Sequence, residues 1–227
     1  MKEFLEQYKL DAVLVHTPAN MRNISGFTGE GLVYVSKEDA WILTDSRYTI
    51  AAAKESRGFE VLEYKRNMQQ YLMEKIVKEH PELAEKTFRI GFEDAVMTVE
   101  TYRTLEALFE KMNLKQWELV PLHKKIDKMR QIKTPEEIES IKKAEKIGDE
   151  AFTKVTDWLT KCYREKTSVT EKQVAAHIEF YMRDAGAEGT SFDTIAASGI
   201  HSSMPHAVPT DKVLEEGDFL TMDFGCL

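Results

Sequence analysis

The sequence has 227 residues, enough for one large or two modest domains, and its 42% hydrophobic and 31% charged residues are ordinary for a globular protein. A net charge of −8, with acids and bases interspersed, argues against a nucleic-acid backbone as the main partner. No apolar run approaches the roughly 20 residues of a membrane span, and the N-terminus lacks the apolar stretch of a signal peptide. Two cysteines far apart, Cys162 and Cys226, predict no disulfide framework, which favours a cytoplasmic location.

Residues 1–121 alternate between strand-like and helix-like patterns, which predicts a layered α/β domain. Asp45 can cap a helix over residues 46–57, because its carboxylate can accept free backbone N–H groups. Asn67 and Thr98 begin two further predicted helices, whose apolar residues recur at helical spacing. Short apolar runs predict strands at 12–16, 32–35, 41–44, 60–64, 89–92 and 117–120.

Residues 122–133 are polar and basic, which predicts a linker to a second domain over residues 134–227. Thr134 and Pro135 give the first long helix of this domain an N-cap and a favoured first residue. An apolar stripe at helical spacing then continues as far as Trp158.

A second capping box follows, formed by Thr170 and Gln173, and Gly186 ends the helix that they begin. Two strands are predicted after this helix, over residues 192–197 and 219–223. The second domain is therefore also expected to combine helices with strands.

Two segments match known binding motifs in sequence but lack the neighbouring elements that those motifs require. The glycine-rich segment 26–31 precedes a strand, whereas a dinucleotide fingerprint follows a strand and opens a helix. Its glycines are expected in turns, and no cofactor-binding residue is predicted. Asp223-Phe224-Gly225 spells the magnesium motif of protein kinases, but no His-Arg-Asp loop precedes it, which excludes that interpretation.

Asp223 and His206 are the candidates for chemistry. Asp223 ends the mostly apolar run 219–223, so its carboxylate is expected to be partly buried. A buried carboxylate is costly unless it is hydrogen-bonded, ion-paired or bound to a metal, and the residues alone leave these possibilities open. His206 follows Pro205 in a predicted loop, where a histidine is either simply exposed or takes part in catalysis.

A series of short motifs, taken in order and spacing, resembles the Xaa-Pro aminopeptidase and Xaa-Pro dipeptidase (prolidase) family. The first group resembles its creatinase-type N-terminal domain and consists of Asp11-Ala12-Val13-Leu14-Val15, Pro18-Ala19-Asn20, Ser25-Gly26-Phe27-Thr28-Gly29 and Thr44-Asp45-Ser46-Arg47-Tyr48. The second group resembles the first half of its pita-bread metallopeptidase domain and consists of Lys133-Thr134-Pro135-Glu136-Glu137-Ile138, Thr170-Glu171, Gly189-Thr190-Ser191-Phe192-Asp193-Thr194-Ile195, Ala197-Ser198-Gly199, Pro205-His206-Ala207 and Gly217-Asp218 with Asp223-Phe224-Gly225.

The resemblance implies a creatinase-like α/β domain followed by the first half of a pita-bread α+β catalytic domain. It implies hydrolysis of the bond before a proline, assisted by two divalent metal ions (manganese, cobalt or zinc) on two Asp, one His and two Glu side chains. Asp223 matches the first of these ligands, and the other four are expected after Leu227. His206 matches the histidine that contacts the substrate near the scissile bond and steadies the tetrahedral intermediate.

The resemblance also implies a proline-containing peptide as substrate and a homodimer, while no nucleic-acid or membrane partner is expected. Since Asp223 is the single ligand within residues 1–227, this chain alone is expected to bind no catalytic metal and to hydrolyse nothing. His201 stands where the family often has Asn or Arg, and it is assigned no role.

Two other functions are compatible with the same pair of domains. A creatinase-like amidinohydrolase works without metal and uses the matching histidine as acid and base, although it has no need of Asp223. A non-catalytic peptidase-like domain binds peptides or proteins. Aminopeptidase and dipeptidase activities are not separated by these residues, because substrate length is set elsewhere in the family.

Overall fold

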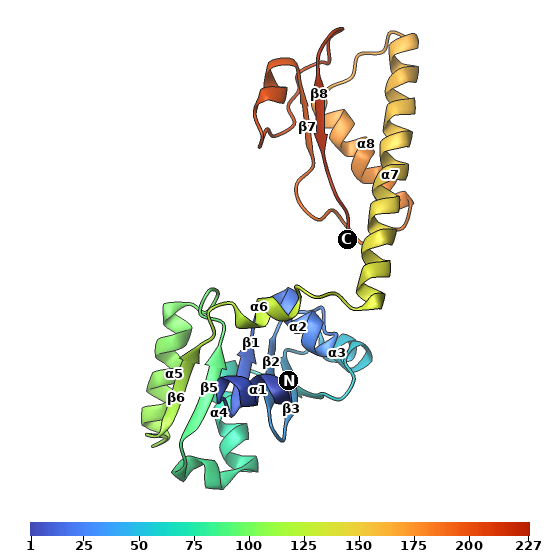
Figure 1. The fold of residues 1–227 in the computed structure, drawn as a ribbon. Coiled ribbons are helices and arrows are strands. Elements are labelled where there is room, and N and C mark those ends of the chain that lie inside the picture. The colour runs from blue at the N-terminus through green and yellow to red at the C-terminus, as the bar shows by residue number, and fades with distance from the viewer. The chain divides into compact units, whose positions relative to one another are not determined.

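The computed structural model describes residues 1–227, which divide into two compact units, Met1–Ile132 and Lys133–Leu227. Each unit has its own sheet (Figure 1). Each also has its own set of buried apolar residues. Neither unit contains a helix that is both long and apolar enough to cross a membrane.

A mixed six-stranded sheet, in the order β4-β3-β2-β1-β5-β6, lies at the centre of the first unit. Strand β2 pairs antiparallel with β1 and β3, and the other neighbours pair in parallel. All six strands correspond to apolar runs that the sequence predicted as strands. Their bounds are β1 (Ala12–Val15), β2 (Leu32–Ser36), β3 (Ala40–Thr44), β4 (Glu60–Glu63), β5 (Phe88–Phe92) and β6 (Trp117–Pro121).

Helices cover both faces of this sheet, which explains why its central strands are apolar on both sides. In β1, Ala12 and Leu14 lie in one buried cluster, whereas Val13 and Val15 lie in the other. The first cluster includes residues of α4 and α5, and the second includes residues of α1, α2, α3 and α6. The helix bounds are α1 (Lys2–Tyr8), α2 (Pro18–Ser25), α3 (Thr49–Glu55), α4 (Met68–Glu79), α5 (Val99–Lys111) and α6 (Lys125–Met129), with a 3-10 helix η1 (Pro81–Glu85).

Part of the predicted linker 122–133 packs onto the first unit. It forms the short helix α6, whose Ile126 is buried in the second cluster. Asn20, buried in α2, binds this segment from the other side. Its amide nitrogen donates to Asp127 at 3.0 Å, and its amide oxygen accepts from Arg130 Nε at 2.6 Å. A buried apolar side chain and hydrogen bonds to two charged side chains therefore both hold the segment on the first unit.

Two local predictions in the first unit are wrong. The helix predicted over residues 46–57 begins only at Thr49, and Asp45 does not cap it. The Asp45 carboxylate instead accepts from the backbone N–H of Arg47 at 2.9 Å and from its guanidinium at 2.7 Å. Helices α1 and α2 were not predicted, because seven and eight residues are too few to establish an apolar periodicity.

The second unit combines two long helices with a two-stranded antiparallel sheet, as the sequence predicted. Both helices begin at the predicted capping boxes, where the side chains of Thr134 and Thr170 accept from backbone N–H groups. The helices cover one face of the strand pair (Figure 1). The bounds are α7 (Pro135–Arg164), α8 (Glu171–Asp184), β7 (Ile195–Ser198), the 3-10 helix η2 (Gly199–Ser203) and β8 (Leu220–Asp223).

Only the later part of the apolar stripe on α7 is buried. Ala151 and Val155 are fully covered, whereas Ile138 and Ile141 are 43% and 47% exposed. Helix α7 has 30 residues and α8 has 14, so α8 can cover only part of it.

Candidate functional site

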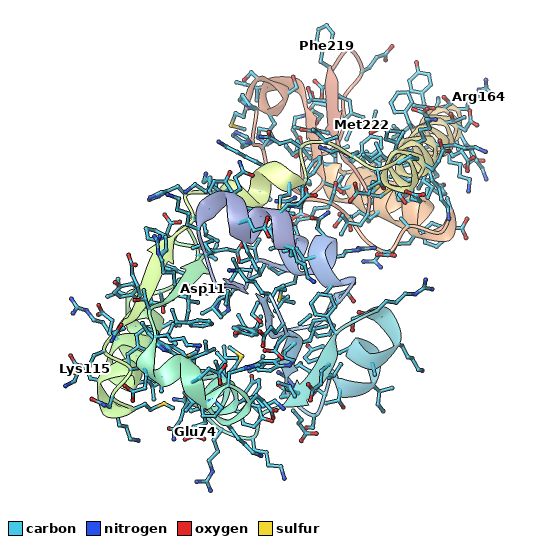
Figure 2. All side chains as sticks on the ribbon, turned by 60° about the horizontal axis from the view of Figure 1, so that its bottom comes forward. Asp11, Glu74, Lys115, Arg164, Phe219 and Met222 are labelled. Atoms are coloured by element: carbon cyan, nitrogen blue, oxygen red, sulfur yellow. The ribbon has the colours of Figure 1, made fainter.

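Asp223 ends strand β8 and pairs with Ile195 of β7. Side chains alternate along β8, so that Leu220 and Met222 pack against the core formed with α7 and α8. Phe219, immediately before the strand, is 84% exposed. Figure 2 shows Phe219 projecting outward and Met222 directed toward the helices. Asp223 therefore belongs to the face of the strand pair that the helices leave open.

The carboxylate of Asp223 is exposed, which corrects the prediction that it is partly buried. The prediction took the apolar neighbours as evidence of burial, but those neighbours alternate between the two faces of the strand. The side chain of Asp223 has no hydrogen-bond or ion-pair partner within residues 1–227. Its oxygens are therefore free to bind a ligand.

His206 lies in the loop that leads from η2 to Thr210, and its ring is exposed. A turn beside it is closed by the N–H of Ala207, which donates to the carbonyl of Met204 at 3.2 Å. Ala207 is 7% exposed and packs this turn onto the unit. The imidazole of His206 has no partner within residues 1–227, so the loop presents it to solvent.

Glu171, the first residue of α8, is fully buried, and its carboxylate accepts hydrogen bonds from both ends of this loop. Oε1 accepts from the N–H and the hydroxyl of Ser198 at 2.7 and 3.0 Å. Oε2 accepts from the N–H and the hydroxyl of Thr210 at 3.0 and 2.6 Å. His201 Nδ1 lies 3.1 Å from Oε1 and must carry a proton there, because a carboxylate only accepts.

These contacts determine the charge of Glu171. Burial alone would raise the pKa of this carboxyl group. The hydrogen bonds from Thr210 and Ser198 outweigh burial and lower the pKa to about 2. Glu171 is therefore ionised at neutral pH.

An ion pair between Lys212 and Asp218 fixes the segment before β8. Lys212 Nζ lies 2.6 Å from Asp218 Oδ2 and also donates to the hydroxyl of Ser198 at 3.1 Å. The pair raises the pKa of Lys212 and lowers the pKa of Asp218. Gly199 packs against the same carboxylate with a φ of +56°, and a Cβ there would lie 2.6 Å from Asp218 Oδ1. Only glycine fits at this position.

The residues present do not by themselves fit the metal pair that the resemblance implies. Within residues 1–227, no group of three or more His, Cys, Asp or Glu side chains is arranged to hold a metal ion. A protein site for such an ion needs at least three well-placed ligands. The structure places His206 and Asp223 in the same unit, on a loop and a strand that both border η2, but no hydrogen bond joins them.

Sequence reasoning missed Glu171 and assigned no role to His201. An acidic residue at the start of a helix is ordinarily explained by the helix dipole. Nothing in its spacing shows that its partners, Ser198 and Thr210, lie 27 and 39 residues away along the chain. Such a contact becomes visible only once the fold brings the loop against the helix.

The first unit contains a cleft of about 160 Å³. Its lining includes Tyr34, Asp39 and His80, and His80 Nε2 lies 2.7 Å from Asp39. None of the predicted site residues lines this cleft.

Two family models match the chain. Residues 1–132 match the creatinase/prolidase N-terminal domain, and residues 139–227 match metallopeptidase family M24. The first match ends at the residue where the first compact unit ends.

Similar proteins include peptidases of the kind that the resemblance indicated. The chain is 36% identical to an uncharacterized peptidase of Bacillus subtilis, over 99% of this chain and 59% of that protein. The structure is similar to an Xaa-Pro dipeptidase from Bacillus anthracis, with a TM-score of 0.83 and 31% identity over 99% of this chain and 59% of that chain. It is also similar to an X-Pro aminopeptidase from Thermotoga maritima, with a TM-score of 0.80 and 32% identity over 97% of this chain and 60% of that chain.

These matches confirm the predicted fold, a creatinase-like α/β domain followed by the first half of a pita-bread domain. The chain spans about 59% of the length of the relatives that it matches. The second match covers most of α7 and all of α8, β7, η2 and β8.

Proposed function

Because the chain belongs to metallopeptidase family M24 and carries the creatinase/prolidase N-terminal domain, we propose that the protein hydrolyses Xaa-Pro peptide bonds in a metal-dependent reaction. Two solved structures that it resembles, at 31% and 32% identity, are an Xaa-Pro dipeptidase and an X-Pro aminopeptidase. The proposed substrate is therefore a peptide with proline on the carboxyl side of the scissile bond.

The observation that carries this proposal is the contrast between engaged and free polar side chains in the second unit. Glu171, Lys212 and Asp218 are all engaged in contacts within the chain. His206 and Asp223 are exposed and have no such partner. Because neither side chain makes a contact that stabilises the fold, the imidazole is free to bind a substrate and the carboxylate is free to bind a metal ion.

Each free side chain has a proposed role. The Asp223 carboxylate would supply one oxygen ligand of the kind that manganese, cobalt and zinc accept in mixed oxygen and imidazole sites. The imidazole of His206 would donate its N–H to the carbonyl oxygen before proline as that oxygen becomes negative. A hydrogen bond of this type strengthens in the transition state and therefore acts on kcat.

The test is a substrate panel assayed with the protein as its complete gene encodes it. The protein is stripped with a chelator and then restored with Mn²⁺, Co²⁺ or Zn²⁺. We expect metal-restored protein to cleave an Ala-Pro bond and to leave the matched Ala-Ala bond intact. Cleavage of the free dipeptide alone would indicate a dipeptidase, and cleavage of longer peptides would indicate an aminopeptidase.

Other outcomes would support the alternatives. The proposal would be contradicted if the protein cleaved no Xaa-Pro peptide with any of the three metals. Release of urea from creatine by the metal-free protein would indicate the amidinohydrolase. Tight peptide binding without cleavage would indicate a non-catalytic binding domain.

A further inference from the structure

The loop that carries His206 is fastened at both ends to one buried side chain. The loop, residues 199–209, follows Ser198 and precedes Thr210, and both of these residues donate their N–H and their hydroxyl to Glu171. His201, inside the loop, adds a fifth contact. A carboxylate with 0% exposure is thus surrounded by donors from the loop and from the two residues that flank it.

We propose that Glu171 is a positioning residue of the active site, whose carboxylate holds the loop 199–209 and thereby sets the place of the His206 imidazole. This inference rests on the proposed function, because it takes His206 as the group that contacts the substrate. Glu171 itself touches neither His206 nor Asp223 and acts through the loop.

The chemistry of the contacts requires a carboxylate. All the groups that face Glu171 are donors, and an ionised carboxylate is the side-chain group that only accepts. A glutamine at residue 171 would have the same size but would turn an NH₂ group toward donors. At least one buried donor would then lose its acceptor, and the loop would have to move to find another.

Backbone contacts also hold both ends of the loop independently of this carboxylate. At the first end, Ser198 pairs with Leu220 of β8, and the N–H of Gly199 donates to the carbonyl of Phe219 at 2.9 Å. The N–H groups of Glu171 and Lys172 donate to the carbonyls of Lys212 and Thr210, each at 3.1 Å. The N–H of Ser198 and the ring of His201 have only the carboxylate as a partner. Loss of the charge is therefore expected to release the ring of His201 and to loosen the loop between these backbone contacts, toward His206.

A double-mutant cycle tests whether Glu171 acts through His206. It uses the protein as its complete gene encodes it, in four forms: wild type, Glu171→Gln, His206→Ala and the double variant. We expect Glu171→Gln to lower kcat about tenfold or more, with KM and metal content little changed, because a misplaced catalytic group costs transition-state binding. In the His206→Ala background the same substitution should change kcat less than about twofold, because the group it positions is already gone.

Three controls separate positioning from stability. Glu179→Gln, on the same helix, removes a carboxylate that takes no part in these contacts and should leave kcat unchanged. Val155→Ala opens a cavity in the same unit, where the side chain is 0% exposed. It should lower Tm without changing kcat well below Tm. If Glu171→Gln fails to fold, Thr210→Val removes one donor and should give a smaller fall in kcat with the same dependence on His206.

Hydrogen exchange supplies a readout that does not need activity. Peptides covering 199–209 should exchange about tenfold faster in Glu171→Gln than in wild type or Glu179→Gln, because an opened hydrogen bond exposes its amide. Unchanged exchange would overturn the anchoring role. Equal losses of kcat in both backgrounds would overturn the positioning role. An inactive wild type would instead refute the proposed function, and exchange would still decide the anchoring.

Discussion

His206 is an exposed imidazole on a loop, and its removal should affect catalysis without affecting the fold. His206→Ala is expected to lower kcat about a hundredfold or more, the size of effect that follows loss of one donor to a developing oxyanion. Metal content and Tm should stay at wild-type values. Steady-state kinetics on an Xaa-Pro peptide measures the change.

A second exposed histidine, His123 of the first unit, provides the control for that experiment, and its ring contacts only Asp94 at 3.1 Å. The ring of His123 is 68% exposed, and His123→Ala should leave kcat unchanged. Near-normal turnover of His206→Ala would show that this residue has no role in the reaction.

Glu171 also predicts a pH dependence of stability. Its pKa falls from 4.5 to about 2 on folding, which corresponds to about 3 kcal/mol of stability at neutral pH. A lowered folded-state pKa stabilises the protein above the unfolded pKa, and this stability is lost as the pH falls from about 4.5 toward 2. The difference in unfolding free energy between wild type and Glu171→Gln should therefore shrink as the pH falls from about 4.5 toward 2.

Denaturant unfolding at a series of pH values measures this difference directly. The gap in unfolding free energy between the two proteins should be constant above about pH 5 and close to zero near pH 2. A gap that does not change with pH would mean that the carboxylate is not stabilised by the contacts described.

At the level of elements, the packing of α8 against α7 and the strand pair makes a prediction about two isoleucines. Ile178 of α8 is 0% exposed, and Ile178→Ala should cost about 2–5 kcal/mol of unfolding free energy. Ile141 of α7 is 47% exposed, and Ile141→Ala should change stability by less than about 0.5 kcal/mol. Urea denaturation compares them, and equal losses would contradict the described packing.

Elements with strong end signals were predictable, and short ones were not. The capping boxes at Thr134 and Thr170 place a side-chain acceptor and a reciprocal acid or amide three residues apart, a pattern that few other structures satisfy. Asp45 is also a residue type that is favoured as an N-cap, but its carboxylate pairs with Arg47, two residues away. A local ion pair of this kind competes with capping, and the sequence pattern does not show which of the two contacts will form.

At the scale of the whole chain, the division into two units predicts where proteases act first. Residues 131–134 are exposed and lie outside the helices and strands. Trypsin should therefore cut after Arg130 or Lys133 before it cuts after Lys161, which is exposed but lies within α7. Mass spectrometry of early fragments tests this order, and first cleavage after Lys161 would contradict it.

The candidate site was predictable in its residue types but not in its geometry. His206 and Asp223 were identified from motifs that resemble a known family. The exposure of Asp223 depends on which face of β8 the helices cover, and the role of Glu171 depends on a loop that returns to the start of α8. Both features depend on tertiary contacts, which the spacing of residues along the sequence does not reveal.

The most direct measurement of the central claim is a metal titration that follows bound Mn²⁺ and Xaa-Pro turnover together. Chelated protein, as its complete gene encodes it, is compared with Asp223→Asn across the same concentrations. The account predicts that wild-type turnover rises with bound metal, and that Asp223→Asn binds metal at least about tenfold more weakly and loses turnover with it. Full turnover of metal-free wild type, or wild-type affinity and turnover in Asp223→Asn, would contradict the account.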